Sequence, residues 1–307
     1  MRFRKLDLNL LVALDHMLEL RSVSEAADRM FMSQSAMSNA LTRIRTYFDD
    51  PLLIQVGRRM ELTPRAEAMR PAIRDILVRV EATIDVQPEF RPDQSNRTFN
   101  VLLSDYTMRV LMPEFLALVE ETRATVRFNF LPQTDVPYTL LERGELDLLI
   151  SPESLISRDH PSSLLYEDEY VVLADKNGPY GKGPMDLETY QAASHVVMVP
   201  PSNAKSVEAT LVEMAGVSRK IDVTTFSFSS LPYLVAGTSR IATVHRRLAR
   251  VIGKQVPIVY YPLPFKGSPL RQMLQWHAYR ELDQGIIWLR SVLEEASRRM
   301  DIHSLGQ

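Results

Sequence analysis

The segment from Ser22 to Phe48 constrains the fold most, because it has the pattern of two short helices joined by a tight turn. Ser22 stands three residues before Glu25, which is the spacing of a helix-capping box. Ser33 is a second candidate cap, placed directly before a helical stretch that begins at Gln34. The segment therefore predicts a pair of short capped helices.

The second predicted helix has one apolar and one polar face. Apolar residues recur at helical spacing at Ala36, Met37, Ala40, Leu41, Ile44 and Phe48. Amides, hydroxyls and guanidinium groups occupy the other face, at Gln34, Ser35, Ser38, Asn39, Thr42, Arg43 and Arg45. Such groups suit base edges and phosphates, so the pattern favours a helix-turn-helix that binds DNA. An ordinary helical hairpin with a solvated face has the same pattern and stays open at this point.

A short β-hairpin is predicted after these helices. Asp49-Asp50-Pro51 is a turn signal, and residues 52–56 and 60–63 have the pattern of two strands around Gly57-Arg58-Arg59. This arrangement predicts a wing beside the helix pair. Arg58 and Arg59 at its tip would contact the DNA backbone or a minor groove.

The motifs of this region resemble the DNA-binding domain of LysR-type transcriptional regulators. The resemblance rests on Ala26-Ala27, the SQSAMS run from Ser33 to Ser38, and Leu62-Thr63-Pro64, and the opening LDLNLLVALDHMLELRSVSEAA is similar to the same family. The run from Arg43 to Phe48 departs from the commoner ending of a Leu-Glu pair followed by Leu-Gly. That departure is similar to the subgroup of regulators of nodulation and of naphthalene, salicylate and nitroaromatic breakdown.

The resemblance implies roles for the polar residues. Ser33, Gln34, Ser35 and Ser38 are expected to face bases, with Asn39 and Thr42 on the same DNA-binding face. The expected phosphate contacts are Arg43, Arg45, Arg58 and Arg59.

A long helix is predicted from Pro64 to about residue 85, with Thr63 as its cap. Its apolar stripe is Ala68, Ala72, Ile76, Leu77, Val80 and Ile84. This helix matches the family's linker helix, which implies pairing with a second copy, and the alternative is packing on its own domain. Residues 87–97 are polar and contain proline, which is typical of a hinge.

Strands and helices alternate from Thr98 onward. Predicted strands cover residues 98–103, 126–131, 146–150, 170–174, 195–199, 221–228 and 240–244, and the last amphipathic helix covers 284–300. This order predicts a parallel α/β architecture with two lobes and a cleft between them. The region resembles the family's effector-binding domain, which is built like a type II periplasmic binding protein. Expected domains are a winged helix-turn-helix at 1–63, a linker helix and hinge at 64–89, and an effector domain at 90–307, with lobe I at 97–168 and 268–307 and lobe II at 169–267.

Residues after predicted strands are the candidate effector contacts, because ligands bind at the carboxyl ends of parallel strands and at helix N-termini. In lobe I the candidates are Ser104, Asp105, Tyr106 and Thr107. In lobe II they are Pro200, Ser202 and Asn203 in the equivalent loop, with Phe226 and Phe228 at a strand end and His195 at a strand start as further candidates. Helix capping and core packing are the alternative roles of these residues. The subgroup resemblance implies an aromatic or phenolic effector, and no cofactor is expected.

The sequence also argues against two other classes of protein, an enzyme and a secreted solute-binding protein. The chain of 307 residues has no cysteine, which excludes disulfides and cysteine-ligated zinc. Its six histidines have no metal-binding spacing, and an isolated Ser202-x-x-Lys205 pattern lacks the companion motifs of a serine enzyme. A secreted solute-binding protein would need a signal peptide, but Asp7, Asn9 and Asp15 interrupt the N-terminal apolar run. We therefore expect a cytoplasmic regulator and no enzyme.

The expected partners follow from the same resemblance. A symmetric dimer would bind an imperfect inverted repeat in double-stranded DNA, and the family implies homotetramers built from dimers. RNA polymerase is an expected partner, and a membrane is not, because no apolar run reaches the ~20 residues needed to span one. Activation is the expectation, although no residue of the sequence decides between activation and repression.

Overall fold

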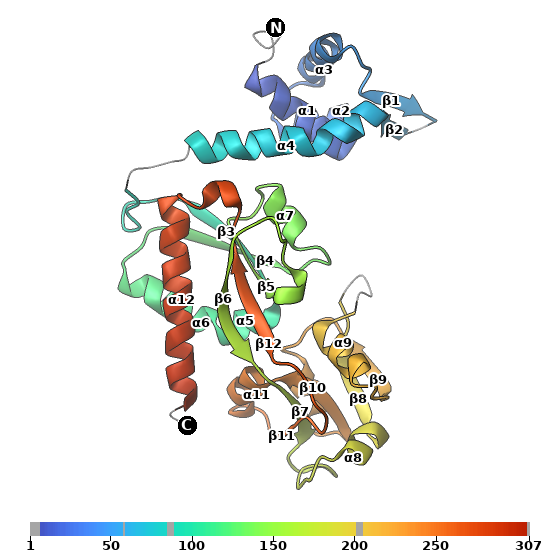
Figure 1. The fold of residues 1–307 in the computed structure, drawn as a ribbon, viewed down its shortest axis with the longest axis vertical. Coiled ribbons are helices and arrows are strands. Elements are labelled where there is room, and N and C mark those ends of the chain that lie inside the picture. The colour runs from blue at the N-terminus through green and yellow to red at the C-terminus, as the bar shows by residue number, and fades with distance from the viewer. Residues whose placement is uncertain (1–6, 58, 85–88, 201–204, 306–307) are drawn as a thin grey trace. The chain divides into compact units, whose positions relative to one another are not determined.

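The computed structural model describes residues 7–57, 59–84, 89–200 and 205–305, and the chain forms two compact units, Met1–Val86 and Gln87–Gln307 (Figure 1). Each unit contains its own cluster of buried apolar side chains. Within the described ranges, we find no helix with the length and apolar character needed to cross a bilayer.

The first unit is a winged helix-turn-helix followed by a long helix, as predicted. Its elements are α1 (Leu8–Leu20), α2 (Val23–Arg29), α3 (Gln34–Phe48), β1 (Leu53–Val56), β2 (Arg59–Leu62) and α4 (Pro64–Ile84). The predicted caps are confirmed: the hydroxyls of Ser22 and Ser33 each accept a backbone N–H bond of 3.2 Å, at α2 and α3 respectively. Thr63 caps α4 in the same way, at 3.1 Å.

The turn between α2 and α3 depends on small residues and on one left-handed residue. Ala26 and Ala27 are fully buried, which lets the helices approach closely. Phe31 has a φ of 52°, and its N–H bonds to the Asp28 carbonyl oxygen at 3.1 Å. The side chain of Phe31 is 98% exposed, so the turn forms without burying it.

The apolar stripe predicted on α4 divides into two faces in the structure. Ala66, Ile73 and Leu77 are buried in the core of the first unit. Ile76 and Ile84 are 45% and 74% exposed. The expectation of one continuous stripe is thus corrected, because the helix packs on its own unit and also presents apolar side chains to solvent.

The second unit has two lobes, each with a five-stranded sheet. Lobe I contains β3 (Thr98–Leu103), β4 (Arg127–Pro132), β5 (Leu148–Pro152), β6 (Ser162–Asp168) and β12 (Leu270–Gln275), in the order β4-β3-β5-β12-β6. Lobe II contains β7 (Tyr170–Asp175), β8 (Ser194–Met198), β9 (Lys220–Thr225), β10 (Arg240–His245) and β11 (Ile258–Pro262), in the order β11-β7-β10-β8-β9. The helices are α5 (Asp105–Val110), α6 (Met112–Glu121), α7 (Tyr138–Glu142), α8 (Leu187–Ala192), α9 (Val207–Met214), α10 (Leu231–Val235), α11 (Arg246–Gly253) and α12 (Gln284–Leu305), with 3-10 turns at Glu153–Leu155 and Ala278–Arg280.

The sheets are mixed, which corrects the prediction of parallel sheets. β3, β4 and β5 are parallel, and so are β8, β9 and β10. β12 is antiparallel to β5 and β6, and β7 is antiparallel to β10 and β11. The antiparallel strands are those at the two passages of the chain between the lobes. β6 and the helix α8 were not predicted, since the burial pattern of β6 does not alternate regularly and α8 has only six residues.

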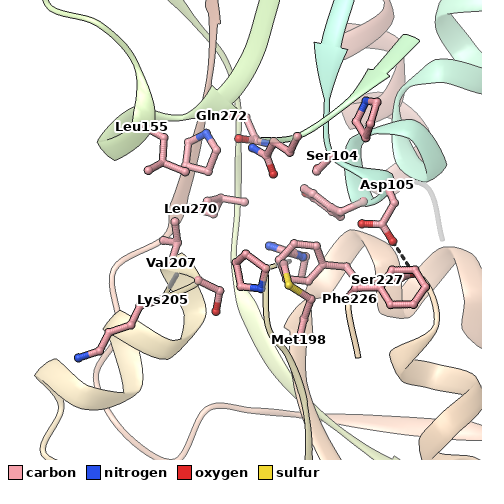
Figure 2. Close-up of a pocket in the computed structure, with 18 of the residues that line it drawn as sticks. Ser104, Asp105, Leu155, Met198, Lys205, Val207, Phe226, Ser227, Leu270 and Gln272 are labelled. Carbon is pink, nitrogen blue, oxygen red and sulfur yellow. Dashed lines mark hydrogen bonds between the residues drawn. The ribbon is translucent and has the colours of Figure 1, made fainter. Parts of the chain in front are cut away.

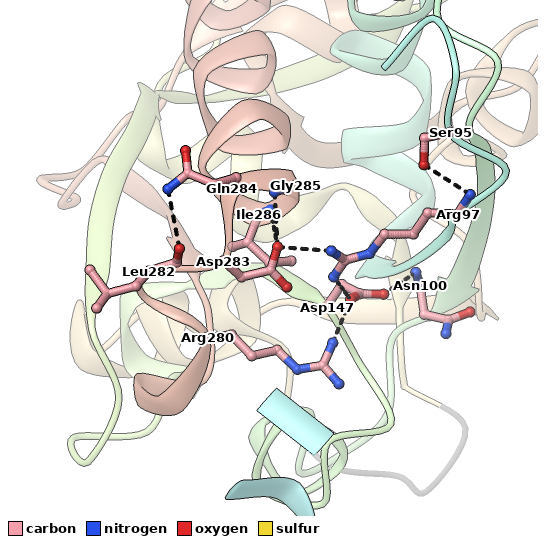
Figure 3. A network of polar contacts seen from close by, with 10 residues as sticks. All are labelled: Ser95, Arg97, Asn100, Asp147, Arg280, Leu282, Asp283, Gln284, Gly285 and Ile286. Carbon is pink, nitrogen blue, oxygen red and sulfur yellow. Dashed lines mark hydrogen bonds and ion pairs between the residues drawn. The ribbon is translucent and has the colours of Figure 1, made fainter. Parts of the chain in front are cut away.

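A buried ionic network closes lobe I (Figure 3). The Asp147 carboxylate accepts hydrogen bonds from Arg97 at 3.1 Å, from Arg280 at 2.7 Å and from the Asn100 N–H at 2.8 Å. Arg97 also donates to Asp283 at 2.8 Å. Three segments that lie far apart in the sequence are thereby joined at the N-terminal end of α12.

The segment predicted as a hinge packs on lobe I over its later part. The ring of Phe90 lies 6.0 Å from that of Phe99 and 5.5 Å from that of Trp288, between ring centroids. Gln87 and Pro88, where the predicted hinge begins, lie outside the described residues. Residues 89–97 therefore belong to the second unit, and Phe90 packs against its core.

Candidate functional site

The polar face of α3 is exposed from Gln34 to Arg43, and Arg45 is half-buried. Its buried side chains are Met37, Ala40, Leu41 and Ile44. The exposed set includes the residues predicted to face DNA bases: Ser33, Gln34, Ser35, Ser38, Asn39 and Thr42. Because burial of one face fixes the rotation of the helix, these side chains are presented together on the surface.

The predicted phosphate-binding arginines have different surroundings. Arg43 is exposed and lies 3.5 Å from the carboxylate of Asp7. Arg45 donates from Nε to the Pro51 carbonyl and from Nη2 to the Leu53 carbonyl, both at 2.7 Å. Arg59 is exposed at the start of β2, and Arg58 lies outside the described residues. Two of the three Arg45 nitrogens thus hold the connection from α3 to the wing, a role that the sequence did not indicate.

A pocket of about 420 Å³ lies between the two lobes of the second unit (Figure 2). Ser104, Leu155 and Gln272 from lobe I face Met198 and Phe226 from lobe II across it. The lining is mostly apolar and comprises Ser104, Asp105, Tyr106, Pro132, Gln133, Thr134, Asp135, Pro152, Leu155, Tyr170, Met198, Pro200, Lys205, Ser206, Val207, Phe226, Ser227, Phe228, His245, Leu270 and Gln272. A size of this order suits a small organic ligand.

The structure brings together most of the predicted effector contacts. The lining includes Ser104, Asp105, Tyr106, Pro200, Phe226 and Phe228. Ser202 and Asn203 lie outside the described residues. Thr107 and His195 are buried away from the lining, which corrects their expected position. Thr107 lies behind the wall, where its hydroxyl contacts Ser104 and Gln272. His195 bonds to the Tyr190 carbonyl at 2.7 Å in a separate core cluster.

An aromatic cluster forms one wall of the pocket and joins the lobes. Tyr106 of lobe I stacks on His245 of lobe II, with ring centroids 3.8 Å apart and planes at 20°. Tyr170 and Phe228 each lie 5.0 Å from the His245 ring. Burial lowers the pKa of His245 to about 3, so its ring is neutral at physiological pH.

Two carboxylates connect the lobes beside this wall. Asp105 accepts hydrogen bonds from the Ser227 hydroxyl at 2.7 Å and from the N–H and hydroxyl of Ser229 at 2.9 Å. Asp168 accepts a 2.6 Å bond from the Tyr106 hydroxyl within lobe I and a 3.2 Å bond from the Arg247 N–H of lobe II. Burial raises the pKa of this carboxyl group. Burial also raises the pKa of Tyr106 well above its usual value, so the phenol remains protonated and donates. The pocket is therefore closed by polar contacts on one side.

Gln272 is the polar group of the lining best placed to recognise a ligand. Its side chain is 1% exposed, and its amide nitrogen donates to Thr107 at 2.9 Å. Its amide oxygen is buried without a hydrogen-bond partner among the described residues. An unpaired buried acceptor is costly, so a donor on a bound ligand would stabilise it.

Several lining residues were not predicted from the sequence, although the rule that ligands bind at the carboxyl ends of parallel strands would have found them. Pro132, Pro152, Met198 and His245 all stand at the carboxyl ends of parallel strands. The rule was applied to only some strands. Tyr170, Leu270 and Gln272 belong to the antiparallel strands that connect the lobes, and no local sequence pattern marks them.

The described residues contain no group of three His, Asp or Glu side chains that could hold a metal ion. Among the described lining residues, the Ser227 hydroxyl donates to Asp105 and the Gln272 amide nitrogen donates to Thr107, so both groups are engaged in structural bonds.

Comparisons with protein families match both units. The model described as "Bacterial regulatory helix-turn-helix protein, lysR family" matches residues 8–67. The model described as "LysR substrate binding domain" matches residues 92–298. Together these two models cover most of the chain.

Similar curated proteins span the full chain. Nodulation protein D 1 of Rhizobium meliloti (strain 1021) is 38% identical over 305 residues, which are 99% of this chain and 99% of that protein. Nodulation protein D 1 of Rhizobium leguminosarum bv. phaseoli is 39% identical over 308 residues, covering 99% of this chain and 98% of that protein.

Solved structures agree on the fold. A probable transcriptional regulator from Pseudomonas aeruginosa is 28% identical and has a TM-score of 0.65, with 96% of this chain and 98% of that chain covered. Full-length CbnR in complex with its target DNA is 16% identical, with a TM-score of 0.59 and coverage of 96% and 100%, which supports the fold alone. This chain therefore belongs to the LysR family and is a transcriptional regulator, not an enzyme, with an N-terminal DNA-binding domain and a C-terminal effector-binding domain.

Proposed function

We propose that this regulator binds an imperfect inverted repeat in DNA and that a neutral aromatic or phenolic effector, bound between lobes I and II, controls its activity. The observation that carries the DNA part is the exposed polar face of α3, held in place by its buried apolar face. Gln34, Ser35, Ser38 and Asn39 supply the donors and acceptors that base edges require. Arg43 and Arg59 supply the phosphate contacts, with Arg58 in the same turn of the sequence.

The proposed dimer pairs through α4. Ala68, Ala72, Ile76 and Ile84 are exposed. Each of the first three is a neighbour of the next at four-residue spacing, so they form an apolar stripe that winds slowly round the helix toward Ile84. A second copy would cover this apolar stripe, and two-fold symmetry would then match the inverted repeat. Homotetramers, activation through contact with RNA polymerase and a cytoplasmic location complete the proposal, and each of these rests on family membership.

The proposed effector chemistry follows from the pocket's lining. No arginine occurs among the lining residues that the structure describes, and Lys205 is paired with Glu213 at 2.7 Å. In Figure 2 the Lys205 side chain extends away from the other lining residues. Flat rings and aliphatic groups dominate the wall, while the Gln272 oxygen offers an unpaired acceptor. A neutral phenol satisfies these features, because its ring fills the apolar space and its hydroxyl donates to Gln272.

Selection of genomic DNA fragments by the purified full-length protein, followed by footprinting, tests the DNA part. The expected result is a few discrete sites with inverted repeats at a fixed half-site spacing. Retention of random fragments at moderate salt by a folded sample would contradict sequence-specific binding.

Titration calorimetry with 2-naphthol and 2-methoxynaphthalene tests the effector part. These two probes share a ring system, and only the first can donate a hydrogen bond. Replacing Gln272 with leucine should lower the affinity for 2-naphthol by about tenfold, which corresponds to the loss of roughly one hydrogen bond in a buried site. The affinity for 2-methoxynaphthalene should stay within about twofold on the same reasoning. Equal losses for the two probes would contradict the proposed contact.

A further inference from the structure

A second cavity in the effector domain, of about 560 Å³, lies beside the contact between α5 and α11. It shares no lining residue with the interlobe pocket. The helix α5 presents Asp105 and Tyr106 to the interlobe pocket, and Arg109 and Val110 to this second cavity. The wall of the second cavity therefore has residues from both lobes.

The lining of the second cavity is strongly basic around an apolar floor. Its basic side chains are Arg109, Arg247, Arg250 and Lys254. Its single acidic lining residue among those described, Glu114, lies 3.9 Å from Arg299, a partner outside the cavity. The floor is made of buried apolar residues such as Val110, Ala249 and Ile258. Among the described residues, the lining therefore has more basic than acidic side chains.

Arg247 gives independent support for an anionic occupant. Its Nη2 donates to the Glu167 carbonyl at 3.1 Å and pairs with Asp301. Its Nε and Nη1 atoms are buried and have no acceptor among the described residues. The guanidinium is 16% exposed, so water reaches little of it. The guanidinium also lies over the Tyr166 ring, 5.5 Å from its centroid. Arg247 thus adds a nearly buried positive charge to the cavity wall, and an anion in the cavity would offset that charge.

We propose that this cavity binds a small organic monocarboxylate. The carboxylate would lie among the guanidinium and ammonium groups, and the ring or short alkyl chain would cover the apolar floor. An inorganic anion would leave the floor exposed to water, whereas a neutral molecule would bring no counter-charge to the four basic side chains of the lining. The cavity volume lies in the range of ordinary small-molecule sites.

Titration calorimetry on the full-length protein tests the proposal with three probes: benzoate, hexanoate and the neutral isostere benzamide. Benzoate and hexanoate are expected to bind, and benzamide at least about tenfold more weakly, since it lacks the charge. Equal binding of benzoate and benzamide, or no binding by either carboxylate, would overturn the proposal. Binding of inorganic phosphate alone would overturn it too, because the apolar floor would then have no role.

Paired variants locate the site. The double change Arg250→Gln and Lys254→Gln should lower the affinity for benzoate by about tenfold or more. The matched control, Lys182→Gln with Lys220→Gln, removes the same charge from exposed positions outside this lining and should leave the affinity unchanged. All four residues are exposed, and equal thermal unfolding of the variants checks that the fold is kept.

The interlobe pocket supplies the last control. Gln272→Leu should leave benzoate binding unchanged, because Gln272 lines only the interlobe pocket. If benzoate binding were lost in Gln272→Leu and kept in the double variant of Arg250 and Lys254, the probe would occupy the interlobe pocket. The second site would then be refuted.

Discussion

The polar face of α3 and the interlobe pocket are built in opposite ways. The surface proposed to face DNA comes from one helix, is polar, and is oriented by the apolar residues on the helix's other side. The pocket is concave and mostly apolar, and its walls come from segments spread between Ser104 and Gln272. A surface made within one helix depends on local rules, whereas a pocket made from many segments depends on the contacts that bring them together.

The polar contacts of the two units follow the same division. In the first unit, Ser22, Ser33 and Thr63 cap the helices within three residues of their own position. In the second unit, Asp147 and Asp105 hold segments that are distant in the sequence. We therefore expect single substitutions of these long-range carboxylates to cost more stability than loss of a cap.

Asp147→Ala is expected to have the largest effect. It leaves Arg97 and Arg280, which are 24% and 11% exposed, without their shared carboxylate. Removing one partner of a buried ion pair typically costs about 3–5 kcal/mol. Urea unfolding followed by tryptophan fluorescence measures this loss, because both tryptophans, Trp276 and Trp288, lie in the effector domain.

Glu153→Ala is the matched control for Asp147. Glu153 pairs with Arg271 at 3.0 Å, but both side chains are more than 40% exposed. An exposed pair contributes about 0–1 kcal/mol. Similar losses for Asp147→Ala and Glu153→Ala would show that the network in lobe I is no more important than a surface pair.

The sequence predicted the first unit more fully than the second for the same physical reason. Helical spacing and serine caps are local patterns of residues that lie close together in the sequence. The sequence therefore predicted α2, α3 and their exposed face. Tyr170, Leu270 and Gln272 became pocket residues only because antiparallel strands carry the chain between the lobes. Arg45 shows the limit of local reasoning even in the first unit: its place on the polar face was predicted, but its bonds to Pro51 and Leu53 depend on the path of the following loop.

Acid should weaken the effector domain through His195. This side chain is fully buried, and burial lowers its pKa from 6.5 to about 4. Between these two values the unfolded chain binds a proton that the folded chain does not, so stability is complete above pH 6.5 and falls as the pH drops toward 4. At ~1.4 kcal/mol per pKa unit, the loss is roughly 3 kcal/mol.

Unfolding of wild type and His195→Gln across this pH range isolates the His195 contribution. The variant should be less stable than wild type at neutral pH, and its stability should fall less steeply between pH 6.5 and 4. Parallel curves for the two proteins would mean that other groups, such as the buried His245, cause the acid sensitivity.

Gln34→Ala tests whether the exposed face of α3 reads sequence. Loss of a base contact should reduce the preference for the operator over a scrambled duplex by ~1–3 kcal/mol. Thr46→Ala is the control on the same helix, since Thr46 is exposed and its hydroxyl already bonds to the Thr42 carbonyl at 2.9 Å. Equal weakening on operator and scrambled DNA would remove Gln34 from the base contacts.

Substitutions of Arg43 and Arg45 should distinguish a residue that contacts DNA from one that holds the fold. Arg43→Ala is expected to lower the slope of binding against salt by roughly one phosphate contact. Arg45→Ala should mainly destabilise the first unit, because two backbone carbonyls lose their donors. Salt-dependent operator binding and thermal unfolding of both variants measure the difference. An unchanged slope for Arg43→Ala, with a lowered slope for Arg45→Ala, would reverse the two roles.

Ser33 and Ser22 allow the smallest effect to be resolved. Both hydroxyls accept a backbone N–H at 3.2 Å, so each alanine substitution should cost about 1 kcal/mol in thermal unfolding. Only Ser33 stands at the N-terminus of α3, where it is exposed beside the proposed base contacts. Operator affinity measured under fully folded conditions should therefore fall for Ser33→Ala and stay unchanged for Ser22→Ala. If both variants bind the operator as wild type does, the Ser33 hydroxyl acts only as a cap, and the DNA-facing surface begins at Gln34.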